Sequence, residues 1–200
     1  VNNSTADLLT VFDLNPSGVT TLLITPPPSG LFAGDYTLIT SFANLGGSPA
    51  NFALAGITSA GRGQTFSVIY DANSVKLRVI GSPAQLTWVG DGVANVWDTS
   101  TTNWLNAGNP DAFFSGDQVT FDGSGSSSPA VNLTGSLQAN VINVTGSQNY
   151  TFVGTGKLTG IGVLTNAGPG TLSIMTSNDF TGKSAITGGT LAITNESALG

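Results

Sequence analysis

Apolar and polar residues alternate along most of the chain in short runs, and Gly, Asn or Pro interrupts the runs roughly every 8–12 residues. An alternation with a period of two is that of a β-strand with one buried face. No long stretch has the 3.6-residue period of an amphipathic helix. The pattern therefore predicts an all-β fold.

The clearest repeat lies in the last third of the chain. Residues 170–174 (GTLSI) return as residues 189–193 (GTLAI), a shift of 19 residues. Short Thr/Leu/Ile strands recurring with this period between Gly and Asn residues are typical of a β-solenoid, in which each coil buries its apolar face only against its neighbours. Residues 129–200 have room for about four such coils, above the roughly three that a stable stack needs.

The alternation also assigns side chains to the inside and outside of these coils. The expected inward positions are Val131, Leu133, Ile142, Val144, Phe152, Leu172, Ile174, Ile186, Leu191 and Ile193. The expected outward positions are Asn132, Asn143, Thr151, Ser173 and Ala192. We expect stacked aliphatic side chains inside and polar ladders outside.

Two further regions precede the coils. Residues 1–84 are β-rich, as hairpins or irregular coils, and the strands expected at 65–70 and 75–80 flank a four-residue hairpin loop. Residues 85–128 form a connecting segment that contains all three Trp residues and ends in a Gly/Ser tract. The expected organisation is therefore 1–84, 85–128 and 129–200.

Charge and composition exclude several classes of function. The net charge is −6 with only five Lys and Arg residues, so no basic patch can displace counterions from phosphates, and we expect neither nucleic acid nor an anionic membrane surface as a partner. The absence of Cys and His excludes disulfides, Cys/His zinc sites, Cys nucleophiles and His bases. No apolar run approaches the ~20 residues that span a bilayer, so we expect no membrane insertion of this segment.

The Trp-rich segment holds the best candidates for ligand binding. Trp88, Trp97 and Trp104 could form a stacking platform for sugar rings, with Asp98 and Asn103 holding sugar hydroxyls. The competing interpretation is packing at an end of the coils or at a sheet junction, since Trp is mostly buried. We favour packing and keep the three Trp residues and Asp98 as candidate ligand-binding residues.

Five carboxylates also cluster in this segment, and a suitably spaced pair could hydrolyse glycosides or a group could hold calcium. They are Asp91, Asp98, Asp111, Asp117 and Asp122. Asp also favours turns for its own hydrogen bonds, and no calcium-loop motif is present. We therefore expect no catalytic residues, no metal and no cofactor.

The C-terminal motifs carry a family resemblance. Residues 168–174 (GPGTLSI), 178–182 (NDFTG), 188–191 (GGTL) and 197–200 (SALG) resemble, in this order, the autotransporter-associated β-strand repeat. The Trp and Asp residues of 85–128 are similar to the segment that often precedes this repeat, and Lys183 departs from its usual small residue. The resemblance implies a right-handed parallel β-helix, secreted or displayed on the bacterial cell surface, with no catalytic residues.

The expected function is thus a non-enzymatic stalk or passenger segment of an extracellular, adhesion-related bacterial protein. The alternatives are a self-assembling extracellular fibre subunit and a carbohydrate-binding or polysaccharide-cleaving module. The chain begins at Val1 without Met and stops at Gly200 without a polar cap, so we expect an excised piece. The expected partners are further coils or another copy stacked at that end, together with surface glycans.

Overall fold

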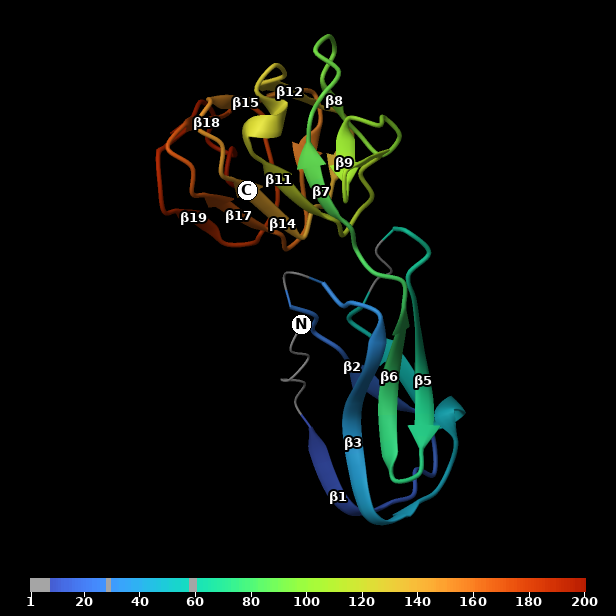
Figure 1. Cartoon of the computed structure of the whole chain (residues 1–200). Coiled ribbons are helices and arrows are strands. Elements are labelled where there is room, and N and C mark those ends of the chain that lie inside the picture. The colour runs from blue at the N-terminus through green and yellow to red at the C-terminus, as the bar shows by residue number, and fades with distance from the viewer. Residues whose placement is uncertain (1–7, 28–29, 58–60) are drawn as a thin grey trace. The chain divides into compact units, whose positions relative to one another are not determined.

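The computed structural model describes residues 8–27, 30–57 and 61–200. In these residues the secondary structure consists of strands β1–β20 and two short 3-10 helices, which confirms the expected all-β class (Figure 1). The chain divides into two compact units. Unit 1 comprises Val1–Pro27 and Leu31–Ser82, and unit 2 comprises Pro28–Gly30 and Pro83–Gly200.

Unit 1 contains two sheets. In spatial order the first holds β1 (Leu9–Leu14), β3 (Gly34–Leu45), β6 (Ser74–Ile80) and β5 (Thr65–Asp71). Strand β1 is parallel to β3, and the other two pairs are antiparallel. The second sheet pairs β2 (Thr20–Leu23) with β4 (Phe52–Ala55) in parallel, and the 3-10 helix η1 (Pro49–Asn51) precedes β4.

The hairpin expected between residues 65–70 and 75–80 is confirmed as β5–β6. Asp71 and Ser74 still pair, so the turn between the strands is shorter than expected and consists of Ala72 and Asn73. Buried Val75, Leu77 and Val79 on β6 supply much of the core of unit 1.

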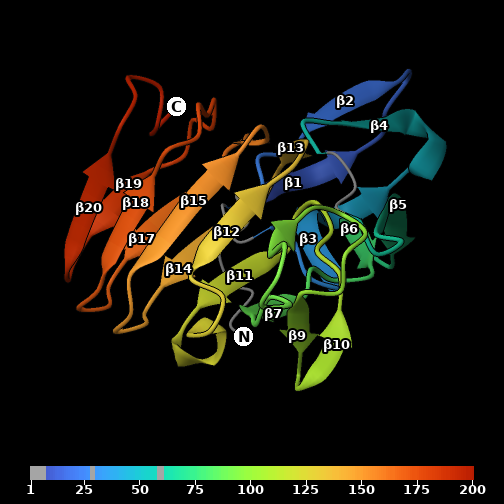
Figure 2. The same ribbon diagram turned by 90° about the horizontal axis from the view of Figure 1, so that it is seen from above.

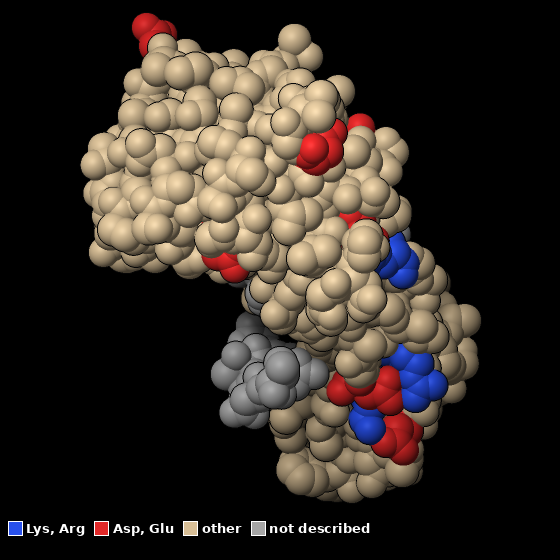
Figure 3. All heavy atoms as spheres, turned by 45° about the horizontal axis from the view of Figure 1, so that its top comes forward, with Lys and Arg blue, Asp and Glu red and all other residues tan. Residues whose placement is uncertain are grey.

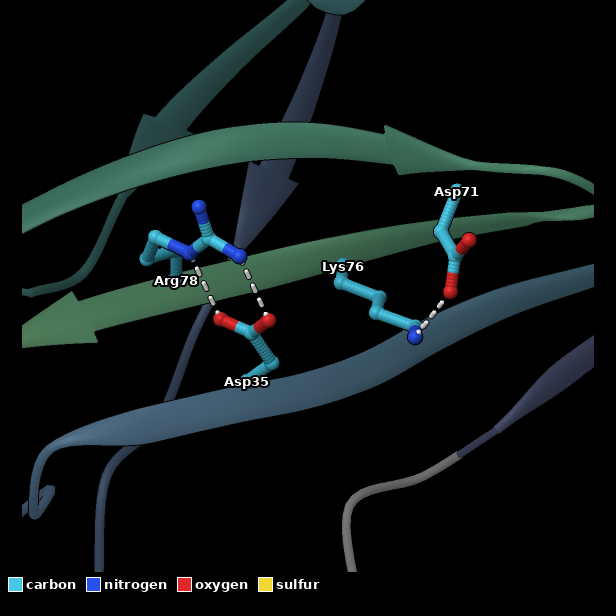
Figure 4. Close-up of polar contacts among 4 residues, drawn as sticks. All are labelled: Asp35, Asp71, Lys76 and Arg78. Atoms are coloured by element: carbon cyan, nitrogen blue, oxygen red, sulfur yellow. Dashed lines mark hydrogen bonds and ion pairs between the residues drawn. The ribbon is translucent and has the colours of Figure 1, made fainter.

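Two ion pairs lie across the strands of this sheet (Figure 4). Nε and Nη2 of Arg78 donate to the two carboxylate oxygens of Asp35 at 2.8 Å each, and Lys76 pairs with Asp71. The hydrogen bond from Arg78 holds the pKa of Asp35 below its usual value. Because all four side chains remain partly exposed to solvent, the two pairs add little to the stability of the fold.

Unit 2 is built from parallel ladders of short strands. The first ladder contains β7 (Gln85–Trp88), β11 (Gln118–Phe121), β14 (Val141–Val144), β17 (Val163–Asn166) and β19 (Ser184–Ile186). The second contains β8 (Val96–Trp97), β12 (Ala130–Leu133), β15 (Tyr150–Gly154), β18 (Thr171–Ile174) and β20 (Thr190–Ile193). A third pairs β13 (Ser136–Leu137) with β16 (Lys157–Leu158).

The strands of the second ladder lie side by side in Figure 2, in the order β12, β15, β18, β20. From β11 onward, paired residues of successive strands are 19 to 23 positions apart along the chain. The 19-residue repeat found in the sequence coincides with the pairing of β18 and β20, in which Leu172 lies beside Leu191.

The first step of the stack is longer because it contains an antiparallel hairpin. Strands β9 (Trp104–Asn106) and β10 (Asn109–Asp111) pair with each other, and β9 pairs with β7 on the side that faces away from β11. Segment 85–128 thus supplies β7, β8 and β11 to the ladders, together with the 3-10 helix η2 (Gly123–Gly125). The sheets of the chain are therefore of mixed orientation.

Inward side chains form continuous columns along the ladders. One column runs through Val119, Ile142 and Leu164, and another through Val131, Phe152 and Ile174, all at most 5% exposed. The expected burial is confirmed for the inward positions from 131 to 174.

In the last two strands Leu191 is partly buried and packs against the core, but for Ile186 and Ile193 the expectation is wrong. Ile186 is 49% and Ile193 53% exposed, although both occupy inward register positions. Strands β19 and β20 are the edge strands of their sheets in the described part of the chain, so no further strand covers these side chains.

Candidate functional site

The three tryptophans meet in the interior of unit 2. Trp88 comes from β7, Trp97 from β8 and Trp104 from β9, and the side chain of each is fully buried. Sequence alternation explains this placement, since Leu86 and Trp88 point inward while Thr87 between them points outward. The structure therefore brings together the three tryptophans that the sequence singled out.

The rings pack edge to face around a common centre. Trp104 lies 4.9 Å from Trp88 and 5.2 Å from Trp97, centroid to centroid, with interplanar angles of 72° and 71°. Phe121 contacts all three indoles. Such tilted, buried rings offer no exposed flat face to a sugar, so in this structure the tryptophans pack and do not form a stacking platform.

The indole N–H groups of this aromatic cluster differ in their hydrogen bonding. Nε1 of Trp88 donates to the carbonyl oxygen of Ser128 at 3.0 Å. Nε1 of Trp97 and Nε1 of Trp104 are buried and have no hydrogen-bond partner among the described residues. The burial of aromatic area outweighs the cost of these two donors, which is about 1–3 kcal/mol each.

Asp98 directly follows Trp97 of β8 and is partly buried. Its carboxylate accepts hydrogen bonds from the backbone N–H and the hydroxyl of both Ser100 and Thr101. Partial burial raises the pKa of Asp98, but these hydrogen bonds outweigh it and hold the pKa below its usual value. Asn103, the other expected hydroxyl ligand, is buried and donates to the carbonyl of Val96.

The remaining carboxylates of this segment also hold turns. Asp117 is buried and accepts the backbone N–H groups of Ala84 and Phe114 at 2.8 and 2.9 Å. Asp91 accepts from Asn95 and Val93, and these backbone hydrogen bonds lower the pKa of its carboxyl. Each carboxylate thus satisfies nearby chain groups.

The same is true of the last two members of the cluster. Asp111 accepts from the side chain of Asn106, and Asp122 accepts the backbone N–H of Ser124. Within the described residues, acidic side chains form no group of three or more that could hold a metal ion.

A groove lies on the outward face of the strands that carry the tryptophans. It encloses about 430 Å³ over β9, β7 and β11. Its principal lining side chains are Gln85, Thr87, Leu105, Thr120, Asp122 and Ser124. This polar groove is the candidate functional site.

Sequence reasoning did not find this groove. Thr87 lies in β7 and Thr120 in β11, far apart along the chain, and only the pairing register of these two strands places them side by side. The available signal was the alternation itself, because it requires an outward residue between each pair of inward aromatic or aliphatic ones.

Comparisons with protein-family models, with curated proteins and with solved structures give no match. The autotransporter repeat therefore remains a resemblance carried by residues 168–200. In the described ranges, none of the helices has the length and apolar character needed to cross a bilayer.

Proposed function

We propose that residues 83–200 form a right-handed parallel β-helix that serves as a non-enzymatic stalk or passenger segment of a secreted, surface-displayed bacterial protein. The observation that carries the proposal is the parallel register of β11, β14 and β17 together with that of β12, β15 and β18. Strands of the two ladders alternate along the chain, as they do when a chain winds around one core.

Right-handedness follows from the general behaviour of parallel connections. A strand that crosses over to a parallel neighbour in the same sheet does so with a right-handed connection in about 98% of cases. Each step from β11 to β14 or from β14 to β17 is such a connection, passing through a strand of the other ladder.

The chemistry of the surface supports a structural role. Charged side chains are few, and most of the face shown in Figure 3 is uncharged. With five Lys and Arg in 200 residues, the chain offers few sites to trypsin-like proteases, which suits a protein outside the cell. The carboxylates of 85–128 accept hydrogen bonds from neighbouring groups of the chain, an arrangement that supports turns.

The first ladder differs at its two ends. At one end β9 occupies the edge of β7 that faces away from β11, so another copy cannot pair directly with β7, whereas β8 of the second ladder is an edge strand in the described chain. The edges of β19 and β20 are open in the described chain, which supports a further coil or another copy as the partner there.

Labelling of intact cells tests the proposal. Antibodies raised against the purified chain should label unpermeabilised cells of the producing bacterium or detect the protein in the medium. Label that depends on permeabilisation would contradict the extracellular role. A crystal structure tests the hand of the winding, and release of reducing ends from polysaccharides by the purified chain would contradict a non-enzymatic function.

A further inference from the structure

We propose that the groove over β9, β7 and β11 binds a neutral oligosaccharide, with sugar hydroxyls bonded to Thr87 and Thr120 and a sugar ring placed against Leu105. This binding function goes beyond the scaffold role and does not depend on it. It also moves the expected glycan contact from the buried tryptophans to the opposite face of the same strands.

The floor of the groove is a row of outward residues in register. Thr87 pairs with Leu105 of β9 on one side and with Thr120 of β11 on the other. Beyond the groove the row continues through Asn143 and Thr165. Neighbouring strands are about 4.8 Å apart, close to the length of one sugar residue in an extended chain, so successive sugars can meet successive side chains.

The walls of the groove stand at the two ends of the strands. Asp122 and Ser124 follow the end of β11, where Asp122 accepts the backbone N–H of Ser124 and thereby fixes η2. At the opposite end of β7 lies the β9–β10 turn, in which Ala107 and Gly108 both have positive φ angles of 48° and 85°. The groove is thus bounded at both ends of the strands.

The groove presents unused hydrogen-bonding groups. Among the described residues, the hydroxyls of Thr87 and Thr120 and the amide of Gln85 make no hydrogen bond with another residue. Both threonines are β-branched and lie in strands, which restricts the rotation of their side chains. Little conformational entropy is therefore lost when a ligand binds to them. Leu105, which is half-buried, supplies an aliphatic surface for the apolar face of a sugar ring.

The character of the lining selects among ligand classes. Asp122 is the charged lining residue, and its negative charge disfavours phosphates and acidic polysaccharides. An extended peptide cannot add as a strand, because the floor is the face of a sheet whose backbone groups already pair in the ladder. A neutral, hydroxyl-rich chain is the ligand that remains.

Calorimetric titration of the full chain tests the proposal. The probes are neutral hexasaccharides of β-1,4-glucan, β-1,3-glucan, mannan and galactan, with a galacturonate oligomer as the acidic comparison. We expect at least one neutral hexasaccharide to bind, and the double variant Thr87→Val, Thr120→Val to bind it roughly tenfold or more weakly, since two hydrogen bonds are lost.

The matched control is Thr151→Val, Thr171→Val, which removes two hydroxyls from outward positions of the second ladder and should bind as the wild type does. Amide NMR shifts of Thr87, Thr120 and Ser124 in the wild-type chain should move on saturation, a readout that does not need the groove variant to fold. Absence of binding by all four neutral hexasaccharides, equal binding by both double variants, or tighter binding of the galacturonate oligomer would overturn the proposal.

Discussion

At the β7 end of unit 2 the first ladder continues into the antiparallel strand β9, and Trp88, Trp97 and Trp104 lie fully buried behind these strands. At the β19–β20 end no further strand of the described chain follows, and Ile186 and Ile193 are about half exposed in positions that are buried in every preceding strand from β11 onward. The same strand geometry thus ends in two different ways.

The difference shows what a stack of parallel strands needs at its ends. Each inward side chain is covered on one side by the strand before it and on the other by the strand after it. At the first end a hairpin and a cluster of large rings replace the missing strand. At the last end no part of the described chain replaces the missing strand. Ile186 and Ile193 therefore contribute only part of the free energy that full burial provides.

The largest expected effect comes from removing an aromatic ring from the first end. Trp104→Ala should lower the free energy of unfolding by about 3–5 kcal/mol, because its ring contacts Trp88, Trp97, Phe113 and Phe121 and leaves a large cavity. Ile193→Ala at the other end should cost about 1 kcal/mol or less. Urea denaturation followed by Trp fluorescence for Ile193→Ala, and by circular dichroism for both variants, measures the difference.

Equal losses for the two variants would mean that the β20 end is covered in solution. A concentration-dependent midpoint for the wild-type chain would then identify another copy as the cover.

The second comparison uses one carboxylate from each end. Asp117→Ala removes the acceptor of two backbone N–H groups, those of Ala84 and Phe114, and should cost about 2–4 kcal/mol. Asp179→Ala removes an exposed partner of Lys157 and should change stability little. Thermal unfolding of both variants tests this, and Asp117→Asn, which keeps one acceptor oxygen, should fall between Asp117→Ala and the wild type.

The pairing of the last strands could be predicted from the sequence, whereas the pairing of the first strands could not, and the reason is physical. Residues 171–174 of β18 and their partners in β20 have similar side chains, and each partner lies 19 positions further along the chain. This pairing is therefore visible in the sequence as a 19-residue repeat. In the earlier steps only the strand positions are constrained by burial, while the loops vary, and the spacing rises to 23 residues.

The candidate site depended even more on pairing that the sequence does not display. Alternation predicts that Thr87 faces away from Trp88, but it does not say which strand lies alongside. The hairpin that supplies Leu105 and the wall at Ala107 comes from an insertion between β8 and β11, outside the repeating pattern. The tryptophans were more conspicuous in the sequence, but burial removes them from the surface.

Hydrogen exchange should reveal the difference between the ends without a mutation. Strands β12 and β15 each have a neighbouring strand on both sides, whereas β19 and β20 each have one neighbour among the described strands. We expect amide protons of β19 and β20 to exchange at least about tenfold faster than those of β12 and β15, because edge strands open locally before the interior does. Uniform protection across the ladders would contradict the open edge.

The smallest effect concerns acid. Backbone hydrogen bonds lower the pKa of Asp91 at the tryptophan end, and Lys157 lowers that of Asp179 nearer the other end. A carboxyl whose pKa is lower in the folded state contributes stability above its unfolded pKa of about 3.9 and loses it as the pH falls through the folded value. With no His or Cys side chain, the melting temperature should stay nearly constant from about pH 5 to 8 and decline below about pH 4.

Salt should act differently on the stabilising contributions of these two carboxylates. At about 1 M sodium chloride, where the Debye length is about 3 Å, the Lys157–Asp179 pair is screened while backbone hydrogen bonds to Asp91 persist. The contribution of Asp179, taken as the difference between wild type and Asp179→Asn in melting temperature at neutral pH, should shrink in salt, whereas that of Asp91, taken from Asp91→Asn, should not. If both shrink alike, the turn at Asp91 is held by long-range charge instead of by the backbone amides of Val93 and Asn95.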